Sequence, residues 1–555
     1  MKKYLFFFCL GFLLPLPAVA AVLSVPGSYA NIRMAVNAAA DGDTIMLADG
    51  TFSGSDNRNI EIDSKSLTFR STSGNPNQCI IDCESKGRAF TITDCETITL
   101  IGITIKNGSV IDKGGAVYCH NSCFTARNCL FSKNVSSSHG GAVYSYSNST
   151  TEKILLSFVN CSFTTNRAKN IGGGVSINSC YSSFIDCHFT DNSAYNGGGV
   201  HISSSKTSSF NGCEFQNNSA SGAGGGVNVA NPATFSHCDF LGNHSTHSGG
   251  AAYVFYNSHQ TTFSDCLFSN NEAKDNGGAI VTSSPKIERC IFAANSSKAT
   301  TKGGGGALYL SSKAVVVNSF FCLNTAAADG GAVRINTYYP PPDPFSTFTN
   351  CTFVQNTANR NGGALWCDIP NNLSKDVLSM KNCILWDDKA VTGDEIYEDG
   401  QSMVVTYSDI AGGHAGTGNL DVDPHLLLFS ECLMRLHCDS PCIDAGTGEA
   451  VPADDLAGIL RPVGEGVDMG AYEYHYDPVE WIGRKTRNGD SWEQAKNWSP
   501  KIVPLPCDTV LIKFRPNPAS TPSPWVYNSQ MVAAGSLTIA GRRLTLSGRL
   551  TLGGI

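Results

Sequence analysis

The fold is decided by a short motif, seen most clearly in Cys213-Glu214-Phe215-Gln216-Asn217-Asn218 and, after a polar stretch, Gly224-Gly225-Gly226-Val227. In a β-strand, side chains two residues apart point to the same face. Cys213 and Phe215 are apolar, so we expect that face to be buried and Glu214 to point outward. The glycine pair supplies a tight turn or a close backbone approach that a residue with a Cβ would resist. The motif therefore predicts short strands joined by tight corners.

The motif recurs nine times, at intervals of 24 to 32 residues. Intervals of this length are typical of a solenoid in which each repeat forms one coil. We therefore predict an all-β fold, a single-stranded parallel β-helix of roughly fourteen coils stacked about 4.8 Å apart, which gives a rod about 65 Å long. Its Phe-x-x-Asn pairs begin at Phe131, Phe163, Phe189, Phe215, Phe240, Phe268, Phe292, Phe321 and Phe353.

We expect the repeated asparagine and cysteine positions to have a structural role and not to bind a ligand. The asparagine amide at the corner is expected to hydrogen-bond to the coils above and below, forming a ladder. Zinc binding by the cysteines is disfavoured because finger-like histidine partners are missing, and parallel in-register Cβ atoms fit disulfide geometry poorly. We expect a ladder of buried thiols instead, and better disulfide pairs off the ladder in Cys79 with Cys83 and Cys438 with Cys442. The ladder residues are Cys161, Cys187, Cys213, Cys238, Cys266, Cys290, Asn166, Asn192, Asn218, Asn243, Asn271 and Asn295.

An open end of such a rod would expose core and strand edges, so it needs a cap. Apolar residues at helical spacing predict a short capping helix over residues 30–40, with Ser28 as its N-cap. The first strand of the β-helix is expected at residues 44–47.

Composition excludes several classes of protein. The chain has 555 residues, 41% of them hydrophobic and 15% charged, with 56 Gly and a formal net charge of −8. This excludes a disordered or collagen-like chain. It also provides no basic footprint for nucleic acid, so we expect no nucleic-acid partner.

The first 20 residues predict a secretory signal peptide. Lys2 and Lys3 precede an apolar run that ends in a small-x-small cleavage site at residues 18–20. No later run reaches the roughly 18 apolar residues of a membrane helix. We therefore expect an exported protein.

Outward positions are where function can be encoded. On the Cys-Phe strands they form a candidate acidic patch, made of Asp186, His188, Glu214, His237, Asp239 and Asp265. Neighbouring rungs place such residues about 5 Å apart, which suits Ca²⁺ binding or acid–base cleavage of a polysaccharide. A solvated sheet face explains the same residues, and the patch has no obvious outward Arg or Lys beside it.

The outward position after each glycine pair gives a candidate aromatic stripe, made of Tyr118, Tyr144, Tyr253, Tyr309 and Trp366. Aromatic rings on a flat face suit stacking on sugars or anchoring a protein partner. The alternative is that these residues simply favour strands and are covered by longer loops. We identify no metal site and no phosphate loop, nucleophile elbow or His-Glu-x-x-His motif.

These motifs resemble a known family. The alternation of Gly-Gly-Ala-apolar with Phe-x-x-Asn over residues 114–364 is similar to the repeats of chlamydial polymorphic outer membrane proteins. That resemblance implies a right-handed β-helix passenger used in adhesion. Residues 41–52 look like the start of pectate-lyase-like β-helices.

Three stretches farther on resemble the closing region of choice-of-anchor surface proteins, at residues 382–386, 440–446 and 468–473. We expect a signal peptide over residues 1–20, a β-helix over 21–400, a closing region over 401–478 and a partial second β-solenoid-like module over 479–555. Residues 480–555 do not resemble the membrane-inserting end of that family, so we expect either that the chain is truncated or that an outer-membrane partner anchors it.

Our leading hypothesis is a secreted, cell-surface β-helix, held at the outer membrane, that acts as an adhesin or interaction scaffold without catalysis. Its expected partners are a host-cell or matrix receptor or a glycan. The alternative is a polysaccharide lyase or glycoside hydrolase, because the fold hosts both roles. No cofactor is expected for the adhesin, whereas Ca²⁺ would suit the enzyme.

Overall fold

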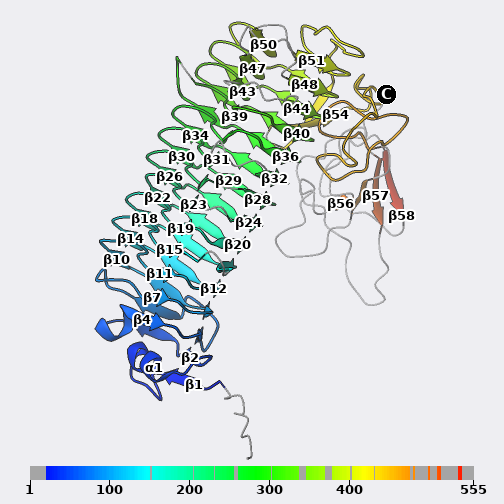
Figure 1. Cartoon of the computed structure of the whole chain (residues 1–555). Helices are drawn as coiled ribbons and strands as arrows, with labels where there is room; N and C mark the ends of the chain where they lie inside the picture. Colours follow the sequence, from blue (N-terminus) through cyan, green and yellow to red (C-terminus); the bar gives the residue numbers. More distant parts are fainter. Residues whose placement is uncertain are drawn as a thin grey trace, which may run out of the picture.

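The computed structural model describes residues 20–475, apart from segments at 150–152, 204–205, 231, 255–260, 302, 337–345, 369–377, 400–402 and 431, and beyond them a few strands. Over this range the chain winds into a long parallel β-helix (Figure 1). The predicted fold class is confirmed. The predicted signal peptide lies almost entirely outside the described residues.

Each coil contributes one strand to each of several parallel sheets. In a middle coil these are β24 (Ser208–Asn211), β25 (Glu214–Gln216), β26 (Ser219–Ala220) and β27 (Val227–Val229), which belong to sheets A, B, D and C. Each strand pairs in register with its counterparts one coil before and one coil after it. An outward side chain therefore lies beside the same position of the next coil.

The remaining strands of sheet A are β1 (Val22–Val25), β2 (Thr44–Leu47), β5 (Leu67–Ser71), β8 (Ile98–Ile101), β12 (Phe124–Arg127), β16 (Leu155–Val159), β20 (Tyr181–Ile185), β28 (Ala233–Ser236), β32 (Thr262–Ser264), β36 (Lys286–Glu288), β40 (Val315–Val317), β44 (Ser346–Thr349), β48 (Leu378–Lys381) and β51 (Met403–Thr406). Those of sheet B are β3 (Gly50–Phe52), β6 (Cys79–Asp82), β9 (Thr104–Lys106), β13 (Leu130–Ser132), β17 (Ser162–Thr164), β21 (His188–Thr190), β29 (Asp239–Leu241), β33 (Leu267–Ser269), β37 (Ile291–Ala293), β41 (Phe320–Cys322), β45 (Thr352–Val354), β49 (Ile384–Trp386) and β52 (Asp409–Ile410).

Those of sheet C are β4 (Ile60–Asp63), β7 (Phe90–Thr93), β11 (Val117–His120), β15 (Val143–Tyr146), β19 (Val175–Asn178), β23 (Val200–Ser203), β31 (Ala252–Val254), β35 (Ile280–Thr282), β39 (Leu308–Leu310), β43 (Val333–Asn336), β47 (Leu365–Asp368) and β50 (Ile396–Asp399). Sheet D consists of two-residue strands, the others being β10 (Ser109–Val110), β14 (Val135–Ser136), β18 (Arg167–Ala168), β22 (Ser193–Ala194), β30 (His244–Ser245), β34 (Glu272–Ala273), β38 (Ser296–Ser297), β42 (Thr325–Ala326) and β46 (Thr357–Ala358).

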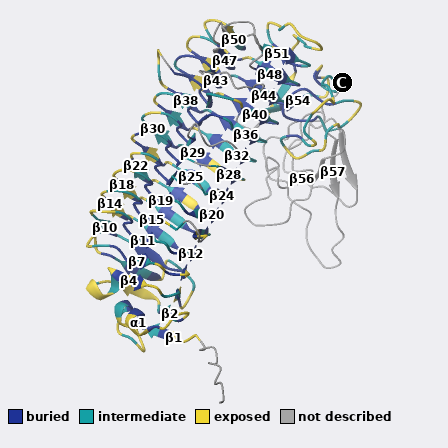
Figure 2. Ribbon diagram, viewed as in Figure 1, coloured by how far each residue is buried: buried dark blue, intermediate teal, exposed yellow. Residues whose placement is uncertain are grey.

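The core is a set of side-chain stacks that run along the axis. The phenylalanines of the repeat, from Phe131 to Phe353, stack nearly parallel with ring centroids 4.6 to 4.9 Å apart. A second stack runs from Phe158 to Phe263 on sheet A. Figure 2 shows the resulting alternation of buried and partly exposed residues along the strands.

The glycine pairs are required by the close approach of successive coils. Gly224 has φ 71°, a left-handed conformation that favours glycine. A Cβ on Gly225 would lie 2.2 Å from the carbonyl oxygen of Gly250 in the next coil. Neither position tolerates a side chain without a shift of the backbone.

The N-terminal cap differs in detail from its prediction. Helix α1 (Ile32–Ala38) buries Ile32, Ala35 and Val36 against the first coil. The N-cap is Asn31, whose Oδ1 accepts a hydrogen bond from the N–H of Met34, so the prediction of Ser28 was wrong. The strand predicted first, at residues 44–47, is β2. Strand β1 precedes it in the chain and pairs with it, so β1 forms the edge of sheet A. A 3-10 helix, η1 (Ser55–Asn57), follows β3.

The chain then folds back along the flank of the last coils, in what we call the closing segment (residues 440–474). A hairpin of β53 (Leu426–Ser430) and β54 (Leu433–Leu436) leads into it. Farther on, β55 (Val479–Trp481), β56 (Trp498–Ser499), β57 (Thr509–Lys513) and β58 (Ser536–Ala540) form a small sheet.

Candidate functional site

The asparagine ladder is buried and continuous. Asn218 is fully buried, and its amide Nδ2 donates to Asn243 Oδ1 at 3.0 Å and to the Phe189 carbonyl at 2.7 Å. Its Oδ1 in turn accepts hydrogen bonds from the backbone N–H and the side-chain amide of Asn192. The same set of bonds recurs at each asparagine from Asn134 to Asn324. These side chains stabilise the corner and leave no surface for a ligand.

The repeated cysteines are buried thiols within the described coils. Cys213 Sγ lies 3.5 Å from the carbonyl oxygens of Phe184 and Asn211, to which it donates. Burial raises the pKa of Cys266 well above its ordinary value, so this thiol is a poor nucleophile. The same buried, unbridged state is found at Cys161, Cys187, Cys238 and Cys290.

Both off-ladder disulfide predictions were wrong. Cys79 and Cys83 are buried free thiols, and so is Cys442, while Cys438 is bonded to a different cysteine. A disulfide joins Cys322 of β41 to Cys432, 110 residues later. Cys322 lies on the outer face of sheet B, where a residue from outside the coil can approach it, and the repeat gives no signal for that partner.

The six residues of the acidic patch fall into two parallel rows. His188, Glu214 and Asp239 lie in register on the outer face of sheet B. The others are Asp186, His237 and Asp265, and they occupy left-handed corners between sheets A and B, with φ 50°, 53° and 55°. The corner conformation separates the two rows, so the patch does not converge on one point.

The first row contains an ion pair and a perturbed carboxyl group. His188 Nδ1 lies 3.2 Å from Glu214 Oε2. Burial, and then the negative charge of Glu214, raise the pKa of Asp239 above its ordinary value. Asp239, which binds a proton more readily than an ordinary aspartate, therefore lies beside Glu214, which is paired with His188.

The second row corrects a sequence-based expectation. We expected no Arg or Lys beside the patch, yet Arg289 binds Asp265 through two nitrogens, at 2.7 and 3.0 Å. Arg289 also reaches Glu288 and Asp454. Its charge is therefore committed to three carboxylates, and it is not free to act as a base.

The aromatic stripe lies on the outer face of sheet C, where cations cover several rings. Tyr118 and Tyr144 stack with centroids 5.7 Å apart, and the guanidinium of Arg88 lies 5.2 Å from the Tyr118 ring. Lys113 lies 4.7 Å from the Tyr144 ring, and burial raises the pKa of Tyr144 to about 12. Contacts of this kind are worth about 0.5–1 kcal/mol at exposed sites.

The stripe is uneven along the axis. Tyr144 and Trp366 are buried, whereas Tyr118, Tyr253 and Tyr309 are half-buried. Three buried residues, Ser176, His201 and Asn228, separate Tyr144 from Tyr253 along the row. Arg334 lies over both Tyr309 and Trp366, at 5.9 and 4.1 Å. The five predicted residues therefore form two separate groups.

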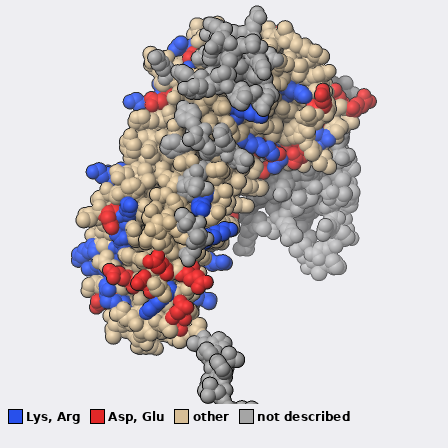
Figure 3. All heavy atoms as spheres, viewed as in Figure 1, with Lys and Arg blue, Asp and Glu red and all other residues tan. Residues whose placement is uncertain are grey.

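A cavity of about 550 Å³ adjoins the first group of aromatic residues. Its lining includes Glu61, Arg88, Asp112, Lys113 and Tyr118, and Arg88 forms an ion pair with Asp112. Figure 3 shows acidic and basic side chains gathered over these N-terminal coils, while the middle coils carry fewer charges. This is the part of the stripe that solvent and charge both reach.

The closing segment binds a row of corner residues that the sequence did not single out. Asn350 Nδ2 donates to the carbonyls of Asp468 and Gly470 at 3.0 and 3.3 Å, and Asn318 Nδ2 donates to the Asp454 carbonyl at 2.6 Å. Asn382 exchanges two hydrogen bonds with the backbone of Thr447. These corners hold the closing segment across three coils.

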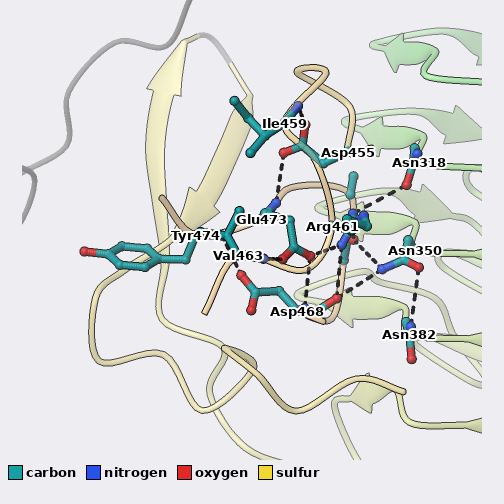
Figure 4. Close-up of polar contacts among 12 residues, drawn as sticks. Asn318, Asn350, Asn382, Asp455, Ile459, Arg461, Val463, Asp468, Glu473 and Tyr474 are labelled. Carbon is teal, nitrogen blue, oxygen red and sulfur yellow. Dashed lines mark hydrogen bonds and ion pairs between the residues drawn. The ribbon is translucent and has the colours of Figure 1, made fainter. Parts of the chain in front are cut away.

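A buried ion pair organises the closing segment itself. Arg461 and Glu473 pair with no exposed side-chain surface, and Arg461 also donates to the Gly470 carbonyl (Figure 4). Burial and the charge of Glu473 raise the pKa of Asp468 to about 7. Beneath this network, Phe320 and Cys322 pack with Ala471 and Tyr472.

The described residues contain no group of three or more His, Cys, Asp or Glu side chains arranged to hold a metal ion. They also contain no helix long and apolar enough to span a membrane.

Two family models match the chain. The right-handed β-helix region matches residues 115–288 and 173–331, and the Chlamydia polymorphic membrane protein repeat matches residues 350–368. These matches confirm the resemblance and the handedness expected from the repeats. No curated protein matches the chain.

Solved β-helix enzymes resemble the chain only distantly. Pectate lyase Pel9A is 13% identical with a TM-score of 0.28, covering 82% of this chain and 97% of its own. A mannuronic acid specific lyase from human gut microbiota is 9% identical with a TM-score of 0.40, covering 70% and 86%. An α-1,3-glucanase from Streptomyces thermodiastaticus is 12% identical with a TM-score of 0.33, covering 69% and 71%. These values support no inference about activity.

Proposed function

We propose that this right-handed β-helix, which carries a repeat of the Chlamydia polymorphic membrane proteins, is exported and displayed at a bacterial surface as an adhesin-like interaction scaffold. An outer-membrane partner would hold it there. The fold and the repeat family support a surface role, and the following arguments concern what the surface does.

The observation that carries the proposal is the contrast between a constant interior and a variable exterior. Inward positions repeat Phe, Cys and Asn from coil to coil. The outward row of sheet B, which is at least partly exposed, changes at every coil, from Ser162 and His188 through Glu214, Asp239 and Leu267 to Ile291. A fixed framework that presents different side chains at regular spacing suits recognition of a partner over an extended surface.

The N-terminal group of aromatic residues is the best candidate contact on that surface. Tyr118 is half-buried and borders the cavity that contains Arg88 and Lys113. Because Arg88 and Tyr144 already pack against the Tyr118 ring, a sugar would have to displace one of them to stack there. This arrangement favours a protein receptor, since aromatic and arginine side chains together are typical of protein interfaces.

Binding of the full-length protein to cultured epithelial cells tests the proposal, with trypsin-treated and deglycosylated cells to separate a protein receptor from a glycan. Changing Tyr118 to Ala should weaken binding about tenfold or more, as expected for a central aromatic contact. Tyr397, half-buried in the same row near the far end, provides the matched control. Equal loss in Tyr397→Ala, or no binding at all, would contradict the proposal. Protease shaving of intact cells tests display at the surface.

A polysaccharide lyase or hydrolase is the second candidate, favoured by the adjacent carboxyl groups of Glu214 and Asp239. They lie on neighbouring rungs, and the raised pKa of Asp239 suits a general acid. Incubation with pectin or alginate, with and without Ca²⁺, should then yield ultraviolet-absorbing unsaturated products or new reducing ends. Loss of product in Glu214→Gln and Asp239→Asn would establish this activity, and no product from the unaltered protein would exclude it for these substrates.

A further inference from the structure

The asparagine ladder ends at a residue that breaks its pattern. In every internal rung the asparagine Nδ2 donates both to the carbonyl of a phenylalanine in the preceding coil and to the Oδ1 of the next asparagine, as Asn324 does to Phe292 and Asn356. The rung therefore needs a hydrogen-bond donor at this position. In the coil after Asn356 the position is occupied by Asp388.

Asp388 fulfils only the acceptor half of the role. Its Oδ1 accepts hydrogen bonds from the backbone N–H and the side-chain amide of Asn356, at 2.6 and 2.7 Å. Glu395 stands in for a further rung, because its Oε1 accepts the Asp388 N–H at 3.3 Å. By the pattern of the ladder, the second oxygen of Asp388 replaces an amide that would donate to the Phe353 carbonyl and to the next acceptor.

The second oxygens of both carboxyl groups are buried without a hydrogen-bond partner, namely Asp388 Oδ2 and Glu395 Oε2. Asp388 is 2% exposed and Glu395 is 5% exposed. A negative charge on these two oxygens would be strongly unfavourable, because both are shielded from solvent and neither accepts a hydrogen bond. Protons on these oxygens would supply the missing donors.

We propose that Asp388 and Glu395 form a proton-binding site in which bound protons replace the amide hydrogens of a ladder asparagine, closing this end of the β-helix in acid and loosening it as the pH rises. The inference is independent of the proposed function.

The negative charges around the site also favour the protonated form of Asp388 and Glu395. Asp388 and Glu395 border a cavity of about 580 Å³ that Asp387, Lys389, Asp394 and Asp423 also line. Lys389 is 3.2 Å from Asp387, and thus partly neutralises it, while the charges of Asp387 and Asp394 disfavour ionisation of the pair. Burial, the largest cause, raises the pKa of Asp388 to about 7 and that of Glu395 to about 11.

The sign of the pH dependence follows from these shifts. A carboxyl group with a raised pKa in the folded state binds its proton more tightly there than in the opened state. Its stabilising contribution is complete below the ordinary pKa, near 4, and is lost progressively as the pH rises. For Asp388 the loss extends to about pH 7, and for Glu395 it continues beyond.

Hydrogen–deuterium exchange of the full-length protein tests the proposal between pH 5 and 8. After correction for intrinsic exchange, protection of peptides covering residues 378–399 should fall by up to about tenfold per pH unit, the limit for release of one proton on opening. Peptides covering residues 208–229, where the ladder contains only asparagine, should keep constant protection. Equal pH dependence in both regions would overturn the proposal.

Two substitutions supply the donor permanently. Glu395→Gln places an amide beside Asp388, and Asp388→Asn restores the ladder residue. Each should retain at pH 8 the protection that the unaltered protein shows at pH 5. Asp423→Asn, an exposed carboxyl in the same cavity, is the matched control and should keep the original pH dependence. An unchanged slope in both variants, or restoration of the unaltered protein at pH 8 by CaCl₂, would show that protons are not what the site binds.

Discussion

Two stretches of sheet B present opposite surfaces although they occupy the same positions of the repeat. Glu214 and Phe320 lie in one outward row, linked by in-register pairing through Asp239, Leu267 and Ile291. Glu214 faces solvent beside His188, whereas Phe320 is fully buried beneath the closing segment. Both coils bury the repeat phenylalanine, Phe215 or Phe321, although Ser319 takes the place of Cys213 in the covered coil. The outward residue is what distinguishes the bare coil from the covered one.

The covered region is held by contacts that the bare region lacks among the described residues. Phe320 packs near Tyr472, with ring centroids 6.1 Å apart, and Cys322 is bonded to Cys432. In the bare region the corresponding residues are polar, such as His188, Glu214 and Gln216. The comparison shows that the outward side chains of sheet B differ between the coils that another segment covers and those that it leaves exposed.

The largest effect should come from removing the apolar contact of the covered region. Changing Phe320 to Ala should lower the free energy of unfolding of the C-terminal coils by about 3–5 kcal/mol, because a fully buried ring leaves a cavity. Glu214→Ala in the same row of the bare region should change it by no more than about 0.5 kcal/mol. Urea unfolding followed by limited proteolysis measures both. Similar values would show that the closing segment contributes little.

A smaller effect should follow from pH. The raised pKa of Asp468 means that docking of the closing segment is strongest below pH 4 and weakens as the pH rises to about 7, because the proton is held more tightly in the docked state. Protease cleavage within residues 447–466 should therefore accelerate between pH 5 and 8, after correction for the protease's own pH profile. The acceleration should persist in Glu395→Gln, which separates it from the end of the asparagine ladder. Cleavage independent of pH would mean that Asp468 keeps an ordinary pKa.

The smallest effect concerns the bare region. Changing Glu214 to Gln should alter the free energy of unfolding by less than about 0.5 kcal/mol, because its ion pair with His188 is solvent-exposed. It should nevertheless lower the pKa of Asp239 toward its ordinary value, since one of the two causes of its rise is removed. Nuclear magnetic resonance titration of the Asp239 carboxyl measures the shift. An unchanged pKa would leave burial as the only cause.

The sequence predicted most of what depends on one coil and its neighbours. Period-two alternation placed Cys213 and Phe215 inward and Glu214 outward, and the interval between repeats predicted parallel coils in register. It did not separate the left-handed corners from the strand, which is why Asp186 and His188 were grouped in one patch although they lie in different rows. Alternation fails wherever one residue adopts a positive φ.

The sequence resemblance predicted a closing region over residues 401–478, but not the coils to which the closing segment binds. Asn318 and Asp454 are 136 residues apart, and nothing local links them. One signal was nevertheless present, because Phe320, Ile384 and Trp386 place large apolar side chains on the face that carries His188 and Glu214 in the bare region. An outward apolar run in a solenoid indicates that another segment covers it.

The corner hydrogen bonds of the closing segment have a mechanical consequence. Tension along the axis pulls successive coils apart across their interstrand hydrogen bonds, which open one rung at a time. The closing segment is hydrogen-bonded to three successive coils, at Asn318, Asn350 and Asn382. These bonds carry part of the axial force on those coils. Under axial tension the protein should therefore extend first in the coils around Glu214, so that the bare region is compliant and the region bound by the closing segment is stiff.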